Sequence, residues 1–112
     1  MSWWRCIALS YGSRAEILSA VKKVGRELVS GKITEEDLTE ENFSKFLYTA
    51  DIPDPDILIR TSGEQRISNY LLWQIAYSEL FFTSTLWPDF SAEEFKKIVE
   101  DFNLRERRYG KV

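Results

Sequence analysis

Two arginines and a serine stand close together in the stretch RTSGEQRIS, residues 60 to 68. Guanidinium groups form charge-assisted hydrogen bonds to phosphate oxygens, and each such bond contributes about 1.5–3 kcal/mol. Gly63 between Arg60 and Arg66 can adopt the positive φ of a tight turn, which lets a polyanion come close to the backbone. Ser68 adds a hydroxyl and, at the start of a helix, free backbone amides at the positive end of the helix dipole. The segment therefore predicts a diphosphate site of about micromolar strength.

The alternative interpretation is that both arginines form ordinary surface ion pairs, with Glu64 or with the acidic segment 34–56. Such pairs are common and contribute little to stability. The loop also lacks the pattern GxxxxGK followed by Ser or Thr, so it is not a Walker sequence. The position of the loop in the fold has to decide between the two interpretations.

Glu79 is the candidate metal ligand of the chain. It follows the apolar stretch 70–77 and precedes Leu80-Phe81-Phe82. Carboxylate oxygens suit a hard cation such as Mg²⁺, and we expect Glu79 to reach the same edge of the sheet as the arginines. The alternative is an ordinary ion pair between Glu79 and a lysine.

The elements that position these residues alternate between strands and helices. Strands are expected at 5–11, 57–59 (buried on both faces) and 80–82. Helices are expected at 13–28, after caps at Thr34 and Thr39, at 68–77 and at 91–102, with capping boxes Ser13/Glu16 and Ser91/Glu94. This order predicts an α/β fold, a parallel sheet flanked by helices, whose ligands lie beyond the carboxyl ends of the strands. Arg60 directly follows such a strand.

Composition excludes several other classes of function. With a single cysteine, Cys6, and no histidine, the 112 residues offer no internal disulfide, no multi-cysteine zinc site and no histidine-based triad. A net charge of −3 argues against a general nucleic-acid binder, although residues 104–112 form a basic tail. No apolar run has the length of a membrane span and the start lacks the pattern of a signal peptide, which predicts a cytoplasmic protein.

Three motifs resemble the cis-prenyltransferases, the isoprenyl diphosphate synthases of the undecaprenyl diphosphate synthase type. The run DILIRTSGEQRISNYLLWQIAYSELFF, residues 56–82, resembles the diphosphate-binding signature of that family. IALSYGSRAEI resembles its upstream strand-turn-helix motif, and LWPDF with RERRYG matches its carboxyl end. The resemblance begins at about Ile7, because the preceding residues, with Trp3 and Trp4, fit no family pattern.

The resemblance implies condensation of isopentenyl diphosphate with an allylic diphosphate such as farnesyl diphosphate, which extends a cis-polyprenyl diphosphate with the help of Mg²⁺. It implies a homodimer, and the lipid product implies peripheral contact with a membrane. The residues that it assigns are Arg60, Arg66, Ile67 and Ser68 for the diphosphate of isopentenyl diphosphate, Glu79 for Mg²⁺, and Arg108 and Gly110 in a tail that crosses the dimer interface.

One departure from the family pattern limits what the chain should do alone. The family carries an aspartate in a His/Asp/Gly/Asn/Arg-rich loop that binds the allylic diphosphate, and this loop is absent here, so no catalytic residue is assigned. Residues 1–112 are therefore expected to be one partial domain, the carboxyl-terminal half of an enzyme, with residues 1–5 as an atypical start, and to be inactive alone. The alternatives are a non-catalytic interaction subunit and an inactive truncated relic.

Overall fold

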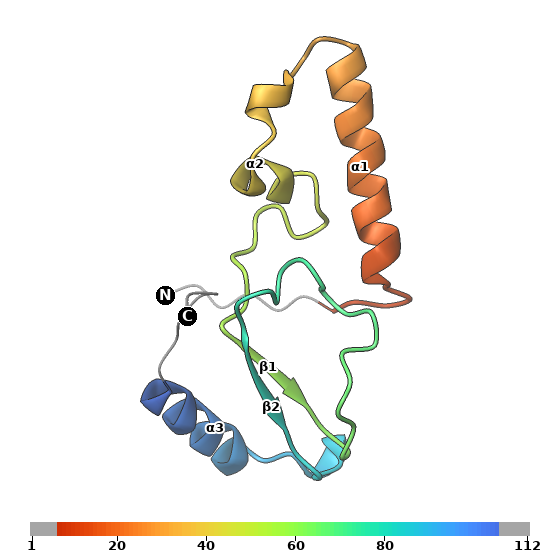
Figure 1. Ribbon diagram of the computed structural model, residues 1–112. Coiled ribbons are helices and arrows are strands. Elements are labelled where there is room, and N and C mark those ends of the chain that lie inside the picture. Colours follow the sequence, from red (N-terminus) through yellow and green to blue (C-terminus); the bar gives the residue numbers. More distant parts are fainter. Residues whose placement is uncertain (1–6, 106–112) are drawn as a thin grey trace. The chain divides into compact units, whose positions relative to one another are not determined.

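The chain folds into two compact units, seen in a computed structural model that describes residues 7–105 (Figure 1). The first, called the α1 unit, contains residues 7–53 and Asn69–Leu72. The second, called the sheet unit, contains Asp54–Ser68 and the described residues from Trp73 onward. The chain therefore passes between the units three times. None of the described helices is both long and apolar enough to cross a membrane.

The α1 unit is built on helix α1, Ser13–Val29. Ala20 and Val24 are the buried apolar residues of this helix, four apart as helical periodicity requires. The helix ends in a Schellman motif, in which Gly31 takes a φ of 76° and Lys32 N–H donates to the Glu27 carbonyl at 2.9 Å. The helix predicted at 13–28 is thus confirmed almost to the residue.

Two short acidic helical segments follow, as predicted. Thr34 caps a 3₁₀ helix at Glu35–Asp37 in a capping box, and Thr39 caps α2, Glu40–Ser44, by accepting a hydrogen bond from Asn42 N–H at 3.1 Å. Both caps satisfy backbone N–H groups that have no partner inside their own helix. Local sequence signals were sufficient to predict these two capped segments.

The capping box predicted for Ser13 and Glu16 is wrong. Gly12 is the N-cap of α1, and Ser13 Oγ instead accepts the N–H of Leu72 at 2.9 Å. Glu16 is 1% exposed, and its carboxylate accepts the N–H of Tyr48 at 2.8 Å and the hydroxyl of Tyr11. Burial and the bond to Glu16 raise the pKa of the Tyr11 hydroxyl to about 12. Contacts distant in sequence thus replace the local cap.

The strand predicted at 5–11 is also wrong for its described part. Residues 7–11 have no strand conformation, and Ile7 and Leu9 are each 83% exposed. A strand needs a hydrogen-bonded neighbour, and among the described residues the only strand ladder joins β1 and β2. An apolar, β-prone composition does not supply that neighbour.

The sheet unit contains strands β1, Ile57–Arg60, and β2, Glu79–Phe82. They run parallel, with Ile57 opposite Glu79 and Arg60 opposite Phe82. The parallel arrangement confirms the sequence prediction. Full burial on both faces does not hold, because every residue of β1 is only half-buried.

A 3₁₀ helix at Trp87–Asp89 and helix α3, Ala92–Leu104, complete the sheet unit. Ser91 caps α3 by accepting the N–H of Glu94 at 3.1 Å, as predicted. The side chain of Glu94 does not complete the capping box, since it is bound to two threonines.

The helix predicted at 68–77 does not form. Residues 69–77 are bends and turns, with positive φ at Ser68, Asn69 and Leu71. Left-handed residues interrupt the i to i−4 ladder of a right-handed helix. Here the chain enters the α1 unit at Asn69, whose carbonyl accepts the N–H of Ser13 at 2.8 Å, and leaves it after Leu72. Tertiary bonds override the helical pattern.

Candidate diphosphate site

Arg60 is the last residue of β1 and lies at the carboxyl end of the parallel pair. Its carbonyl accepts the N–H of Thr83 at 2.9 Å, which extends the pairing one residue beyond β2. The residue is half-buried, and no ion pair within the described part of the chain involves it. The predicted placement at the carboxyl edge is confirmed, with the guanidinium uncommitted.

A tight turn follows Arg60. Ser62 and Gly63 have φ values of 66° and 71°, so Gly63 occupies a conformation that a side chain disfavours. Their N–H groups donate to the carbonyls of Thr85 and Thr83, at 2.8 and 2.9 Å. The turn is therefore confirmed, but these two amides are already bound within the protein. A diphosphate would be held by side chains here rather than by the backbone of the turn.

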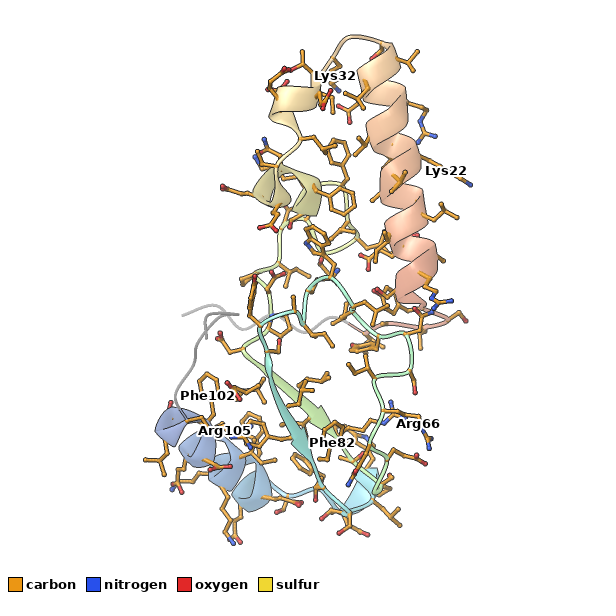
Figure 2. The ribbon with its side chains drawn as sticks, viewed as in Figure 1. Lys22, Lys32, Arg66, Phe82, Phe102 and Arg105 are labelled. Carbon is orange, nitrogen blue, oxygen red and sulfur yellow. The ribbon has the colours of Figure 1, made fainter. Side chains whose placement is uncertain are left out.

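Arg66 lies on the surface of the loop, where its guanidinium forms an ion pair with Glu64 (Figure 2). The side chain of Arg66 is 65% exposed, so the pair is largely hydrated. The surface-pair interpretation is thus confirmed for Arg66. It does not exclude the diphosphate role, because an exposed pair contributes only about 0–1 kcal/mol and a multiply charged phosphate can displace a single carboxylate.

Ile67 and Ser68 are the remaining residues of the predicted diphosphate site. Ile67 is half-buried and Ser68 is exposed, directly after Arg66 in the sheet unit. Because no helix begins at Ser68, the predicted helix-dipole contribution is wrong. Its hydroxyl alone remains available to an anion.

Glu79 does not lie at the carboxyl edge, so that expectation is wrong. It is the first residue of β2 and stands opposite Ile57. The Arg60–Phe82 pair lies three residues further along the strands, a distance of about 10 Å. The predicted strand at 80–82 extends back to include Glu79, which puts the carboxylate at the amino end of the sheet.

The carboxylate of Glu79 pairs with the guanidinium of Arg105 at 3.1 Å. Arg105 also contacts the Leu80 carbonyl at 3.3 Å, the Asp101 carboxylate at 3.5 Å and the ring of Phe81 at 4.0 Å. Figure 2 shows it at the end of α3. The ion-pair alternative is confirmed, with an arginine in place of the expected lysine.

Magnesium binding at Glu79 stays a prediction, because Mg²⁺ can be held by one or two carboxylates together with substrate phosphates. No group of three His, Cys, Asp or Glu side chains gathers anywhere in residues 7–105. A cation at Glu79 would also be repelled by the Arg105 guanidinium already bound there.

Arg105 and a divalent cation should compete for Glu79. In the wild type, the carboxylates of Glu79 and Asp101 share the guanidinium of Arg105. Replacing Arg105 with alanine frees both carboxylates. We expect the affinity for Mg²⁺ measured by calorimetry to rise about five- to tenfold, since a nearby positive charge is lost. Lys97→Ala, which removes a cation elsewhere on α3, is the control. Equal Mg²⁺ affinity in the wild type and Arg105→Ala would contradict the competition.

Arg108 and Gly110, assigned to the tail, lie outside the described residues.

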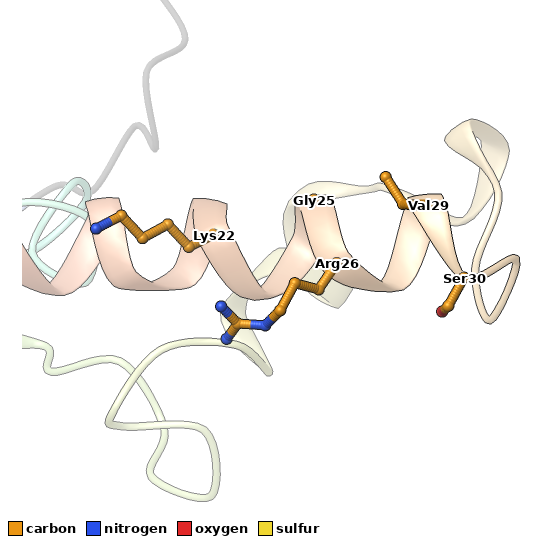
Figure 3. Close-up of a pocket in the computed structure, with 5 residues that line it drawn as sticks. All are labelled: Lys22, Gly25, Arg26, Val29 and Ser30. Atoms are coloured by element: carbon orange, nitrogen blue, oxygen red, sulfur yellow. The ribbon is translucent and has the colours of Figure 1, made fainter.

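A shallow hollow of about 470 Å³ lies on α1, where Lys22 and Arg26 extend beside Gly25, Val29 and Ser30 (Figure 3). All five residues come from one helix and its C-cap. A ligand there would be contacted on one side only, so this hollow is a poor candidate site.

A family model described as "Putative undecaprenyl diphosphate synthase" matches residues 4–110. The chain belongs to this prenyltransferase family. An isoprenyl transferase of Fusobacterium nucleatum is 59% identical over 106 residues. A Thermoplasma volcanium protein named tritrans,polycis-undecaprenyl-diphosphate synthase (geranylgeranyl-diphosphate specific) is 47% identical over 105 residues. These matches cover 95% and 94% of this chain.

A solved structure supports the family fold. Lavandulyl diphosphate synthase from Lavandula x intermedia, solved with dimethylallyl diphosphate, matches 92% of this chain with a TM-score of 0.84 and 35% identity. The predicted fold class, an α/β prenyltransferase fold with a parallel sheet and helices, is confirmed. The chain spans 43% and 41% of the two sequence relatives and 44% of the solved chain.

Sequence reasoning missed one feature of this family member, an aromatic pocket in the α1 unit. The pocket, of about 360 Å³, is lined in part by Tyr11, Tyr48 and Tyr70. The ring of Tyr11 meets those of Tyr48 and Tyr70 edge to face, at centroid distances of 6.5 and 5.6 Å. Because the three tyrosines are far apart in sequence, their spacing gives no signal of a pocket.

Proposed function

We propose that this chain contributes the isopentenyl diphosphate site of a cis-prenyltransferase, which condenses isopentenyl diphosphate with an allylic diphosphate such as farnesyl diphosphate. The observation that carries the proposal is the position of Arg60 at the carboxyl end of β1 within the family signature, where none of residues 7–105 forms an ion pair with it. Ligands of parallel α/β folds lie beyond this end of the strands.

The role of the loop is to hold and orient one substrate. Arg60 and Arg66 neutralise the diphosphate, and Ser68 donates a hydroxyl hydrogen bond to it. Ile67 lies between Arg66 and Ser68 along the loop. A fixed diphosphate limits where the isopentenyl group can lie, and such orientation lowers the barrier of a two-substrate reaction. Ionisation of the allylic diphosphate is assigned to no residue of this chain.

Calorimetry tests the proposal directly. The chain should bind isopentenyl diphosphate at about micromolar strength and isopentenol, which lacks the diphosphate, at least a hundredfold more weakly. Equal affinity for the two would overturn it. In a parallel assay with radiolabelled isopentenyl diphosphate and farnesyl diphosphate, the chain alone is expected to form no polyprenyl product, because it offers no aspartate loop.

Four further features remain predictions from the family resemblance. They are Mg²⁺ as cofactor, a homodimer in which Arg108 and Gly110 cross the interface, a cytoplasmic location, and peripheral contact of the lipid product with a membrane. For Mg²⁺, the Glu79–Arg105 pair would first have to open.

A further inference from the structure

The turn that follows β1 is held by the segment that follows β2. Because the two strands are parallel, both segments leave the sheet at the same edge. Ser62 N–H donates to the Thr85 carbonyl at 2.8 Å, and Gly63 N–H donates to the Thr83 carbonyl at 2.9 Å. The conformation of the turn therefore depends on where the backbone of residues 83–85 lies.

The threonine segment is in turn held by one carboxylate oxygen. Oε1 of Glu94 accepts the Thr83 hydroxyl at 2.7 Å and the Thr85 hydroxyl at 2.8 Å. Thr85 N–H donates to Thr83 Oγ1 at 3.2 Å, which closes the segment on itself. Each hydroxyl has one proton to donate, and Glu94 Oε1 is the nearer acceptor for Thr83, whose oxygen also lies 3.2 Å from the Thr85 hydroxyl oxygen. Hydrogen bonds to an ionised acceptor are about twice as strong as neutral ones.

Helix α3 fixes the position of Glu94. The residue stands in the first turn of the helix, and its own N–H donates to the capping hydroxyl of Ser91 at 3.1 Å. Its half-buried side chain has a short reach from that anchored backbone. Hydrogen bonds therefore run without interruption from the start of α3, through the two threonines, to the turn after Arg60.

We propose that Glu94 is a positioning residue for the diphosphate site. By fixing residues 83–85 it fixes the turn at Ser62–Gly63, and so the direction in which the loop carries Arg60 and Arg66. This inference rests on the proposed function of the loop, but it makes a separate claim about what orders the loop. A merely structural Glu94 would affect the attachment of α3 and leave the turn unchanged.

Three variants test the claim. Glu94→Ala removes the shared acceptor, Glu94→Gln keeps an amide oxygen that can accept both hydroxyls, and Thr85→Val removes one donor with little change of shape. Glu93→Ala, on the exposed neighbouring residue, is the matched control. Circular dichroism first establishes which variants are folded. If Glu94→Ala does not fold, Thr85→Val still tests the claim.

Two readouts separate this inference from the proposed function. Hydrogen exchange of the Ser62 and Gly63 amides should become at least tenfold faster in Glu94→Ala, faster to a smaller degree in Thr85→Val and Glu94→Gln, and unchanged in Glu93→Ala. Affinity for isopentenyl diphosphate should fall about five- to twentyfold in Glu94→Ala and stay within twofold in Glu94→Gln. Unchanged amide exchange in both Glu94→Ala and Thr85→Val would overturn the positioning role, whether or not the affinity for isopentenyl diphosphate changes. If amide exchange becomes faster in Glu94→Ala and Thr85→Val but the wild-type chain binds no isopentenyl diphosphate, the proposed function is refuted and the link from Glu94 to the turn is supported.

Discussion

Replacing both Arg60 and Arg66 with alanine is expected to lower the affinity for isopentenyl diphosphate by at least a hundredfold. Each guanidinium contributes about 1.5–3 kcal/mol through charge-assisted bonds, so each single change should cost about ten- to a hundredfold. Arg60 should show the larger effect. It lies at the strand end without an ion pair to any of the described residues, whereas Arg66 must first leave Glu64. Calorimetry with isopentenyl diphosphate measures all three variants.

The Arg66–Glu64 pair supplies a sharper form of the same test. Glu64→Ala frees the guanidinium of Arg66 and removes a negative charge beside the site, so affinity should rise about two- to fivefold. Arg26→Ala, which removes an exposed arginine of the α1 unit, is the control for net charge. Wild-type affinity in the double arginine variant would exclude the loop as the diphosphate site.

Glu16→Ala is expected to reduce the free energy of unfolding by about 3 kcal/mol, the largest stability effect of any single change considered. The carboxylate is the acceptor for Tyr48 N–H and for the Tyr11 hydroxyl, and it is 1% exposed. Truncation removes the acceptor of both part-buried donors and leaves a cavity in place of the buried carboxylate, and each lost bond to a charged group costs about 1.5–3 kcal/mol. Urea denaturation followed by circular dichroism measures the change.

Glu27 provides the matched control on the same helix. Its carboxylate makes a hydrated pair with Lys32 at 3.7 Å, so Glu27→Ala should change the free energy of unfolding by less than about 0.5 kcal/mol. Glu16→Gln, which keeps one acceptor oxygen, should fall between the two. If Glu16→Ala and Glu27→Ala were equally stable, the buried carboxylate would not hold the α1 unit together.

Features that depend on neighbouring residues could be predicted from the sequence. Thr34, Thr39 and Ser91 cap the segments that follow them, because a cap needs only an oxygen and an N–H two or three residues away. The strand ending at Arg60 carries an equally local signal, a short β-branched run after two prolines. The expected position of Arg60, at the carboxyl end of a parallel strand, is confirmed.

Features that depend on distant partners could not be predicted. Glu16 looked like a capping residue, but Tyr48, 32 residues away, provides its partner. The apolar stretch 68–77 has a helical composition, and the bonds from Ser13 to Asn69 and Leu72 prevent the helix. Glu79 was placed at the wrong edge because β2 begins at Glu79, one residue before the expected strand at 80–82, and the first residue of a strand lies at its amino end.

The three crossings of the chain between the two units determine how the protein can be dissected. A piece ending at Pro53 would contain all of α1 but would lose Asn69 and Leu72, which bind the backbone N–H and the hydroxyl of Ser13. A piece beginning at Asp54 would contain both strands but would carry the Asn69–Leu72 stretch without its partner. A single proteolytic cut near residue 53 should therefore yield two fragments that stay associated, and separate expression of either fragment is a poor route to a folded half.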